Sequence, residues 1–455
     1  MEVEKQFFWR NIPWISPLPL LKSLQNQREH PMLFFSAKSL PEKNGGRFSF
    51  LLFSPEETLF SRAKTDFLGL LEKKLGKRRE IPENAPEAFR HFCGGLAGTL
   101  SYDFGHELEN FTKNKIQNTS FPTGLFQIFE HLVVFDHLHE SAFVGGWFEK
   151  EISADVSFQN FRDRHITVDA FLSEENPHIP YHVFVPEITD VEYKDAFYKI
   201  QNELENGNTF QANFSQQWAS ETNLSSQEIF EILVQKNAAP MMFFLEHENL
   251  SVISCSPERL FSLHNGKIFT QPIAGTRRRG IHQEEDQELE KDLLKNSKEL
   301  AEHSMLVDLL RNDFGRVAEF GTVHVDEFAR VERYASVMHL VSDISAKLAP
   351  EKTVFDIVKA VFPGGTITGA PKVETMDILG RLEKSSRGVY SGSAGYFSFN
   401  GNADFNILIR TIQKIGKSME VRAGGGIVVD SDAEMEYLES IQKAMGVIGA
   451  LGEIN

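Results

Sequence analysis

Residues 423–431 read Ala-Gly-Gly-Gly-Ile-Val-Val-Asp-Ser, and residues 433–444 continue as Ala-Glu-Met-Glu-Tyr-Leu-Glu-Ser-Ile-Gln-Lys-Ala. The three glycines allow the backbone to approach a ligand closely, because they carry no Cβ atom. The second run is typical of a helix, on which Glu436, Glu439 and Lys443 fall at i, i+3 and i+7 and share one face. The stretch therefore places two carboxylates and one ammonium group on the same side of the predicted helix.

A second acidic pair, Glu299 and Glu302, has the same spacing in an earlier helical run. Two such helices facing each other would form a site of oxygen ligands, which suits Mg²⁺. The alternative is that these glutamates lie on solvated helix faces. We expect Asp430 or Ser431 to cap the later helix.

The composition excludes several classes of protein. A chain of 455 residues with a formal net charge of −17 is a poor nucleic-acid binder, because phosphate backbones are bound by clustered Lys and Arg. The only cysteines, Cys93 and Cys255, are too few for a disulfide scaffold and indicate a reducing compartment, where both are expected to be buried. No uncharged apolar segment reaches membrane-spanning length, and the first residues lack a targeting pattern. We therefore expect a cytoplasmic protein that binds neither membrane nor nucleic acid.

The chain divides into two parts by pattern. Residues 1–175 alternate short apolar runs with turn residues, which predicts strands of a largely antiparallel sheet. The glycines at 94–98 indicate a strand where another backbone packs closely. Polar and proline residues around 173–180 predict a linker, after which residues 185–455 form a second domain.

The second part alternates helices and strands, which predicts a mixed α and β fold. A first helix is expected to be capped by Asp190 and stopped by Gly207. Further helices are predicted at about 224–236, 284–312, 353–361 and 371–381, and strands at about 209–215, 241–246, 250–255, 267–273, 389–398, 403–412 and 418–428.

Three longer motifs follow each other in this part. They are Phe362-Pro-Gly-Gly-Thr-Ile-Thr-Gly-Ala-Pro-Lys372, Gln271-Pro-Ile-Ala-Gly-Thr-Arg-Arg-Arg-Gly280 and Glu302-His-Ser-Met-Leu-Val-Asp-Leu-Leu-Arg-Asn-Asp313. Together they resemble the chorismate-utilising enzymes, which include the anthranilate, aminodeoxychorismate, isochorismate and salicylate synthases. The resemblance is dense from about 190 to 450, and the first region is then similar to the N-terminal part of anthranilate synthase component I. It implies an α+β fold of mainly antiparallel sheets in two layers with outer helices, and a chorismate site in the C-terminal part.

The resemblance also assigns roles to single residues. Glu302 and Glu439 match the Mg²⁺ ligands, with Glu299 and Glu436 supporting them through water. The residues that match the substrate-binding positions are Thr366, Tyr390, Arg410, Lys443 and the backbone of Gly424, Gly425 and Gly426. His339 matches a further position in the pocket.

Two of these assignments have an alternative. The apolar neighbours of Arg410 predict that it is buried, whereas the other reading is a salt bridge at a strand edge. Glu258 matches the general acid that protonates the departing 4-hydroxyl group of chorismate. Without the resemblance, its Ser-Pro-Glu context would indicate only a helix or turn start.

The nucleophile is predicted from Gln211. Relatives that add water carry a lysine base at this position, whereas an amide cannot deprotonate water. Ammonia is therefore the expected nucleophile. The chain has no recognisable Cys-His arrangement for glutamine hydrolysis, so we expect a separate glutamine amidotransferase subunit to supply it.

The ring carbon that is aminated is less clearly encoded. Asn213, the pair Gly364-Gly365 and the triple glycine favour an aminodeoxychorismate synthase, which aminates carbon 4. Many aminodeoxychorismate synthases use a lysine as the nucleophile at carbon 2. This chain has Ala274 at that position, as anthranilate synthases do. Thr276 lies in the same motif and is a candidate to hold ammonia or water near carbon 2.

Motifs that form a tryptophan feedback site in anthranilate synthases are altered in this chain. Leu-Leu-Glu-Ser is replaced by Leu33-Phe-Phe-Ser36, and Asn-Pro-x-Pro-Tyr-Met by Asn237-Ala-Ala-Pro-Met-Met242. This change favours the folate branch. The alternatives are an anthranilate synthase and a catalytically idle chorismate-binding paralogue.

Overall fold

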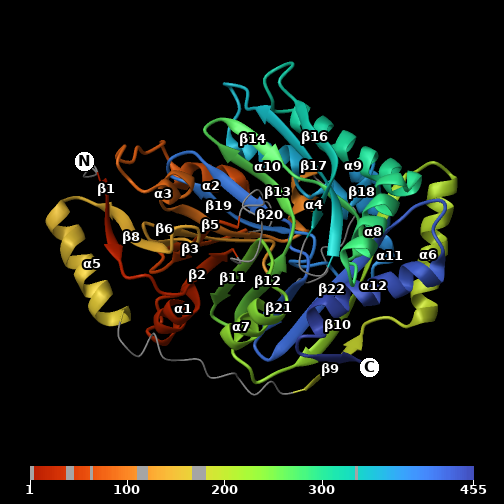
Figure 1. The fold of residues 1–455 in the computed structure, drawn as a ribbon, viewed down its shortest axis with the longest axis horizontal. Coiled ribbons are helices and arrows are strands. Elements are labelled where there is room, and N and C mark those ends of the chain that lie inside the picture. Colours follow the sequence, from red (N-terminus) through yellow and green to blue (C-terminus); the bar gives the residue numbers. More distant parts are fainter. Residues whose placement is uncertain (1–4, 37–45, 62–64, 110–120, 167–180, 334–336) are drawn as a thin grey trace.

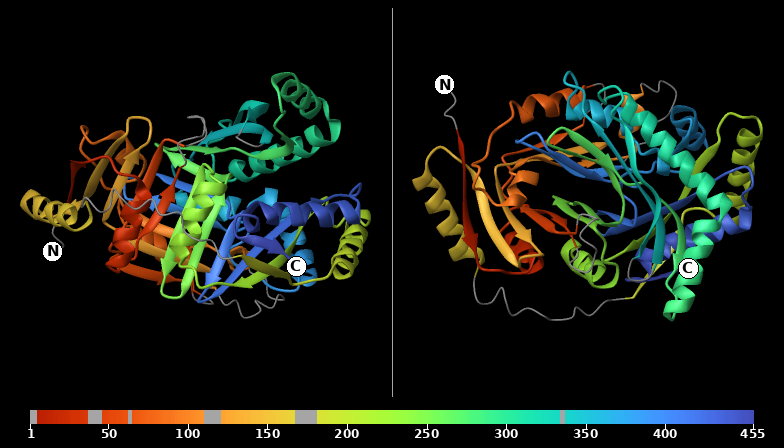
Figure 2. Two further views of the ribbon diagram at one scale, coloured as in Figure 1. Left: turned by 60° about the horizontal axis from the view of Figure 1, so that its bottom comes forward. Right: turned by 45° about the horizontal axis from the view of Figure 1, so that its top comes forward.

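The structure is a computed structural model that describes residues 5–36, 46–61, 65–109, 121–166, 181–333 and 337–455. Two large sheets pack face to face and helices cover their outer faces, as Figures 1 and 2 show. This arrangement confirms the predicted α+β class and its two layers.

The first sheet has 13 strands in the described residues. Their order is β1 (Gln6–Ile12), β8 (Ser141–Phe148), β7 (His131–Asp136), β3 (Phe48–Leu52), β2 (Met32–Phe35), β11 (Met241–His247), β12 (Leu250–Ser256), β21 (Thr411–Ile415), β22 (Ser418–Ile427), β10 (Gln211–Glu221), β9 (His182–Pro186) and β23 (Gly452–Ile454), with β18 (Gly369–Ala370) beside β10.

The second sheet has 10 strands over the same described ranges. Their order is β15 (Ile273–Arg278), β17 (Val337–Lys347), β14 (Lys267–Thr270), β13 (Arg259–His264), β20 (Ala403–Asn406), β19 (Ser393–Ser398), β5 (Gly95–Leu100), β6 (Gly124–Phe129) and β4 (Glu57–Phe60), with β16 (His324–Arg333) beside β17.

The helices form the outer layers because each buries one apolar face against a sheet. The first sheet contacts α1 (Pro17–Asn26), α5 (Glu151–His165), α7 (Ser226–Lys236) and α12 (Ala433–Ile448). The second contacts α2 (Phe67–Leu75), α9 (Ser297–Gly315) and α10 (Val354–Val361). The remaining helices are α3 (Glu87–His91), α4 (Phe104–Leu108), α6 (Asp190–Glu205), α8 (Gln283–Lys295), α11 (Lys372–Leu382) and the 3₁₀ turn η3 (Gly365–Ile367).

The core between the sheets is rich in aromatic side chains. Phe50 and Phe243 of the first sheet pack in one cluster with Ala97 and Tyr396 of the second. Burying such rings supplies much of the apolar area that stabilises a fold of this kind. The many phenylalanines of the chain thus have a structural role. Cys93 and Cys255 are buried and unpaired, as expected.

Strands from both predicted regions share both sheets. β2 pairs with β11 in the first sheet, and β5 pairs with β19 in the second. Glycines permit the second pairing, since a Cβ at Gly95 would lie 2.1 Å from the carbonyl oxygen of Phe397. The division into 1–175 and 185–455 stays a prediction, and the expected linker at 173–180 lies outside the described residues.

Several predicted boundaries were wrong in detail. The helix expected at 284–312 is two helices, because the side chain of Asn296 accepts hydrogen bonds from the backbone N–H groups of Lys298 and Glu299 and so starts α9. The caps of α6 and α12 are Thr189 and Asp432, one or two residues from the expected ones.

The strands expected at 389–398 and 403–412 also differ. The first begins only at Ser393. The second is divided, because β20 ends in one sheet at Asn406 and β21 begins in the other at Thr411. Strands β16 and β17 were not predicted. Among the described residues, none of the helices combines the length and apolar character that a bilayer crossing requires.

Candidate functional site

The antiparallel ladder of β10 and β22 forms the floor of the site. Gly426 lies opposite Asn213, and Gln211 precedes Asn213 by two residues on β10. A Cβ atom at Gly426 would lie 2.2 Å from Nε2 of Gln211, so the glycine makes room for the amide. Gln211 is buried, and its Nε2 is 3.5 Å from Oε1 of Glu302. The amide thus lies between the glycine run and α9.

The four predicted metal-binding glutamates approach one another from α9 and α12. Burial raises the pKa of Glu302, and the negative charges of Glu299 and Glu439 raise it further. Burial likewise raises the pKa of Glu436, which lies against Gly425: a Cβ there would be 2.8 Å from Oε2 of Glu436. The charge of Glu439 on α12 thus acts on Glu302 of α9, so the acidic faces of the two helices lie near each other.

Two cations balance part of this negative charge. Arg277 is 2.9 Å from Oε1 of Glu299, and Lys443 is 2.7 Å from Oε1 of Glu439. Lys443 also donates to the carbonyl oxygen of Gly424, at 3.1 Å. Its ammonium group is therefore tied to the glycine run.

The fit of the glutamates to a divalent cation depends on their free oxygen atoms. Within the described ranges, no group of three or more His, Cys, Asp or Glu side chains is arranged so that it could hold a metal ion. Oε2 of Glu436 is nevertheless buried without a hydrogen-bond partner among the described residues, while Oε1 accepts from Ser431 at 2.8 Å. An unsatisfied carboxylate oxygen beside like charges fits a hard cation.

A carboxyl group with very different surroundings lies at the end of β12. Glu258 is 7% exposed, and burial raises its pKa to about 7. The hydroxyl of Thr366 donates to its Oε1 at 3.1 Å, and this hydrogen bond and the charge of Lys443 lower the pKa in part. A carboxyl group with this pKa is suited to donate a proton near neutral pH.

Three further predicted pocket residues, Ala274, Thr276 and His339, lie on β15 and β17. A bulge between Ala274 and Thr276 brings Thr276 opposite His339. Nδ1 of His339 is 3.1 Å from the carbonyl oxygen of Gly275 and 3.0 Å from Oγ1 of Thr276. Since a carbonyl oxygen only accepts, Nδ1 carries the proton. Burial lowers the pKa of His339, so the ring is neutral at pH 7.

The predicted burial of Arg410 was wrong. Arg410 is exposed, with φ at 51°, at the crossing from β20 to β21. The apolar neighbours Ile407 and Leu408 are buried, but the left-handed backbone turns the arginine out of that layer. In the part of the chain that is described, its guanidinium has no hydrogen-bond or ion-pair partner. Tyr390, in contrast, is buried.

Comparisons with known proteins agree with this geometry. The model of a family described as chorismate binding enzyme matches residues 20–449. The chain belongs to the chorismate binding enzyme family. It is 36% identical to aminodeoxychorismate synthase component 1 of Bacillus subtilis (strain 168), over 95% of this chain and 94% of that relative. It is 34% identical to anthranilate synthase component 1 of Aquifex aeolicus (strain VF5), over 96% and 92%.

Among solved structures, that of anthranilate synthase component I from Streptococcus pneumoniae TIGR4 superposes with a TM-score of 0.79. The two chains are 32% identical, and the match covers 88% of this chain and 92% of the other. The chain is thus an enzyme of the family that acts on chorismate.

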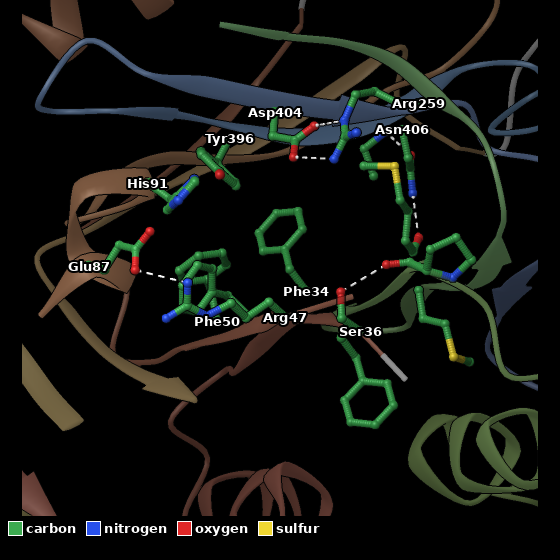
Figure 3. A pocket seen from close by; sticks show the side chains of 16 residues that line it. Phe34, Ser36, Arg47, Phe50, Glu87, His91, Arg259, Tyr396, Asp404 and Asn406 are labelled. Carbon is green, nitrogen blue, oxygen red and sulfur yellow. Dashed lines mark hydrogen bonds and ion pairs between the residues drawn. The ribbon is translucent and has the colours of Figure 1, made fainter. Parts of the chain in front are cut away.

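A cavity of this chorismate binding enzyme, about 310 Å³ in volume, is lined by none of these four glutamates (Figure 3). The two altered tryptophan motifs meet there, because β2 pairs with β11. Ser36 donates to the carbonyl oxygen of Pro240 at 2.9 Å. Phe35 and Met241 occupy the positions of the motif glutamate and tyrosine, and both line the cavity. The wall is completed by two ion pairs, Arg47–Glu87 and Arg259–Asp404.

Sequence reasoning missed one buried ion pair in this family member. Arg387 and Glu383 lie below the site, 2.8 Å apart, with side chains 1% and 5% exposed. The signal was a pair of opposite charges four residues apart, just before Tyr390. Nothing in the local pattern indicated that it is buried.

Replacing Gly426 with alanine should displace the amide of Gln211 without unfolding the protein, because the clash involves the flexible end of a side chain. We expect kcat/KM for chorismate to fall about 10- to 100-fold, while the melting temperature stays near that of the parent. Gly315→Ala is the matched control, since no atom lies within 4 Å of its added Cβ. Equal activity of the two variants would contradict the account.

Thr366→Val should move the alkaline limb of the pH profile to higher pH. The hydroxyl of Thr366 stabilises the ionised form of Glu258, so removing it raises the pKa above about 7 and keeps the acid protonated longer. The limb should shift by about one pH unit. The measurement is kcat/KM from pH 6 to 9 at a constant concentration of free ammonia, with Thr58→Val, remote from the site, as control. An unshifted limb would rule out the hydrogen bond as a determinant.

Proposed function

We propose that this protein is the chorismate-aminating component of an aminodeoxychorismate synthase, which converts chorismate to 4-amino-4-deoxychorismate. The observation that carries the proposal is Gln211, whose amide lies beside Glu302 where a water-adding enzyme needs a basic lysine. Ammonia is nucleophilic in its neutral form and needs no base. The amide is suited to hold it by hydrogen bonds.

The residues of the site divide the work between binding and proton transfer. Arg410 and Lys443 bind the substrate carboxylates, with N–H groups of the glycine run beside Lys443. The buried ring of Tyr390 helps to exclude water. Glu258 donates its proton to the 4-hydroxyl oxygen as the carbon–oxygen bond breaks, and the oxygen departs as water.

A Mg²⁺ ion held by Glu302 and Glu439, with Glu299 and Glu436 in support, would neutralise the ring carboxylate when bound. Arg277 and Lys443 form ion pairs with two of these glutamates, Glu299 and Glu439. Glu436 is the member whose unsatisfied oxygen favours a cation most directly.

Amination at carbon 4 is supported by Asn213, the Gly364-Gly365 pair and the triple glycine. The tryptophan motifs support it too, because Phe35 and Met241 replace their polar residues. Ala274 favours the alternative, an anthranilate synthase, since it provides no nucleophile for carbon 2. If carbon 4 is aminated, ammonia or water held near Gln211 and Thr276 would occupy carbon 2 in place of a lysine. An idle paralogue would not need Glu258 to keep a pKa of about 7.

Activity should depend strictly on Mg²⁺. Glu302→Gln and Glu439→Gln each remove one charge from the metal site, so both should weaken Mg²⁺ binding and lower kcat by at least about 100-fold. Isothermal titration with Mg²⁺ in the presence of chorismate measures the binding directly. Glu434→Gln is the control, because Glu434 lies on the same helix as Glu439 but is exposed and paired with Lys194. Full activity in excess chelator would contradict the proposal.

Ammonium salts at raised pH should replace glutamine, because the chain carries an amination site and no recognisable glutaminase. Purified protein should convert chorismate with ammonium but not with glutamine. Adding a glutamine amidotransferase subunit of the folate branch should make glutamine effective. Efficient use of glutamine by the chain alone would show that the partner is unnecessary.

The product decides between the two branches. With chorismate, Mg²⁺ and ammonium, we expect 4-aminobenzoate only after a 4-amino-4-deoxychorismate lyase is added. The assay is liquid chromatography with fluorescence detection, with and without the lyase. Anthranilate formed without the lyase would overturn the assignment and favour the tryptophan branch.

A further inference from the structure

In the ion pair of Arg387 and Glu383, every N–H donor of the guanidinium group has a hydrogen-bond acceptor. Nε of Arg387 is 2.9 Å from one oxygen of Glu383, and Nη2 is 2.8 Å from the other. Nη1 donates to the carbonyl oxygen of Ile367 at 2.9 Å and lies 3.2 Å from the hydroxyl of Ser391. Nη2 also donates to the carbonyl oxygen of Asn213. The five N–H groups of an arginine are thus all satisfied.

The three acceptors outside the ion pair belong to three different segments of the site. Asn213 lies on β10, two residues after Gln211. Ile367 follows Thr366, the residue that donates to Glu258. Ser391 follows Tyr390. One buried side chain therefore links the amination side of the pocket, the acid side and an aromatic wall.

The partner carboxylate extends this link to the glycine run. Oε1 of Glu383 accepts from the backbone N–H and the hydroxyl of Ser215 on β10, at 3.0 and 2.7 Å. Arg422 of β22 lies 3.1 Å from the same hydroxyl, two residues before Gly424. Burial alone would raise the pKa of Glu383, but the charges of Arg387 and Arg422 hold it below its usual value, so the pair is ionised.

The shape of the group also restricts what can replace it. The guanidinium plane lies over the ring of Tyr102, 4.3 Å from its centroid. A lysine would keep the charge but offers three donors in place of five, and no planar fork. At least two of the links would be lost, most directly those to backbone carbonyl groups.

We propose that Arg387 is a positioning residue, which fixes the distance between Gln211 and the Thr366–Glu258 pair and thereby aligns nucleophile and acid across the substrate. It does not touch the reacting atoms. The proposal rests on the assignment of these residues to the chorismate pocket, but not on which ring carbon is aminated. A misalignment of the order of 1 Å is enough to lower turnover strongly.

The test compares Arg387→Lys with Arg79→Lys in the full chain. Arg79 is half-buried and, like Arg387, is paired with a glutamate (Glu130) and stacked on an aromatic ring (Phe399), but it contacts no segment of the site. Chorismate-binding sites are counted by isothermal titration, and total chorismate consumption with ammonium and Mg²⁺ is divided by that number. We expect kcat per binding site to fall about 10- to 100-fold in Arg387→Lys and by less than about 2-fold in Arg79→Lys.

A merely structural role would lower the number of binding sites and leave turnover per site unchanged, which would overturn the proposal. Ser391→Ala covers the case in which Arg387→Lys does not fold, since it removes one acceptor and leaves the ion pair intact. It should lower kcat per site by about 2- to 5-fold, and an unchanged value would also overturn the proposal. Product identity tests the proposed function separately from turnover per site.

Discussion

The close approach of β10 and β22 is the constraint on which the site depends. A Cβ at Gly424 would lie 2.1 Å from the carbonyl oxygen of Phe214, one at Gly425 would meet Glu436, and one at Gly426 would meet Gln211. Three successive residues without side chains are therefore needed to fit the strand pair, a carboxylate and the amide together. The glycine run thus contributes to the site by leaving room for the neighbouring strand, the carboxylate and the amide.

Electrostatics then gives similar carboxyl groups different states. Glu258 and Glu383 are both buried, but among the described residues the carboxyl group of Glu258 has only the hydroxyl of Thr366 as a direct partner, and its pKa rises to about 7. Glu383 is surrounded by two arginines and stays ionised. Glu302 of α9 and Glu436 of α12 are half-buried and form a third class, in which burial and neighbouring negative charges raise the pKa of each carboxyl group. The state of each group follows from its neighbours.

Much of the fold was predictable from the sequence, because the signals for it are local. These signals are the alternation of apolar and polar residues in strands, glycine-rich strand segments and the helical spacing of apolar residues. The two pairs of glutamates that are proposed to hold Mg²⁺ could be recognised from helical spacing alone, whereas Glu258 and Thr366 depended on the family resemblance. Arg410 was misplaced because nothing local shows where a chain leaves one sheet for another. Arg387 was missed because its acceptor on Asn213 is 174 positions away in the sequence. Contacts of this range appear only when the strands are placed.

The central claim is that ammonia is added to carbon 4 of chorismate in a pocket formed by Gln211, Glu258 and the glycine run. The most direct measurement is carbon-13 and nitrogen-15 NMR of the product formed from chorismate, Mg²⁺ and ¹⁵N-labelled ammonium by the purified chain. The account predicts a one-bond coupling of ¹⁵N to ring carbon 4, with the enolpyruvyl group retained. Coupling of ¹⁵N to ring carbon 2, with release of pyruvate, would contradict it.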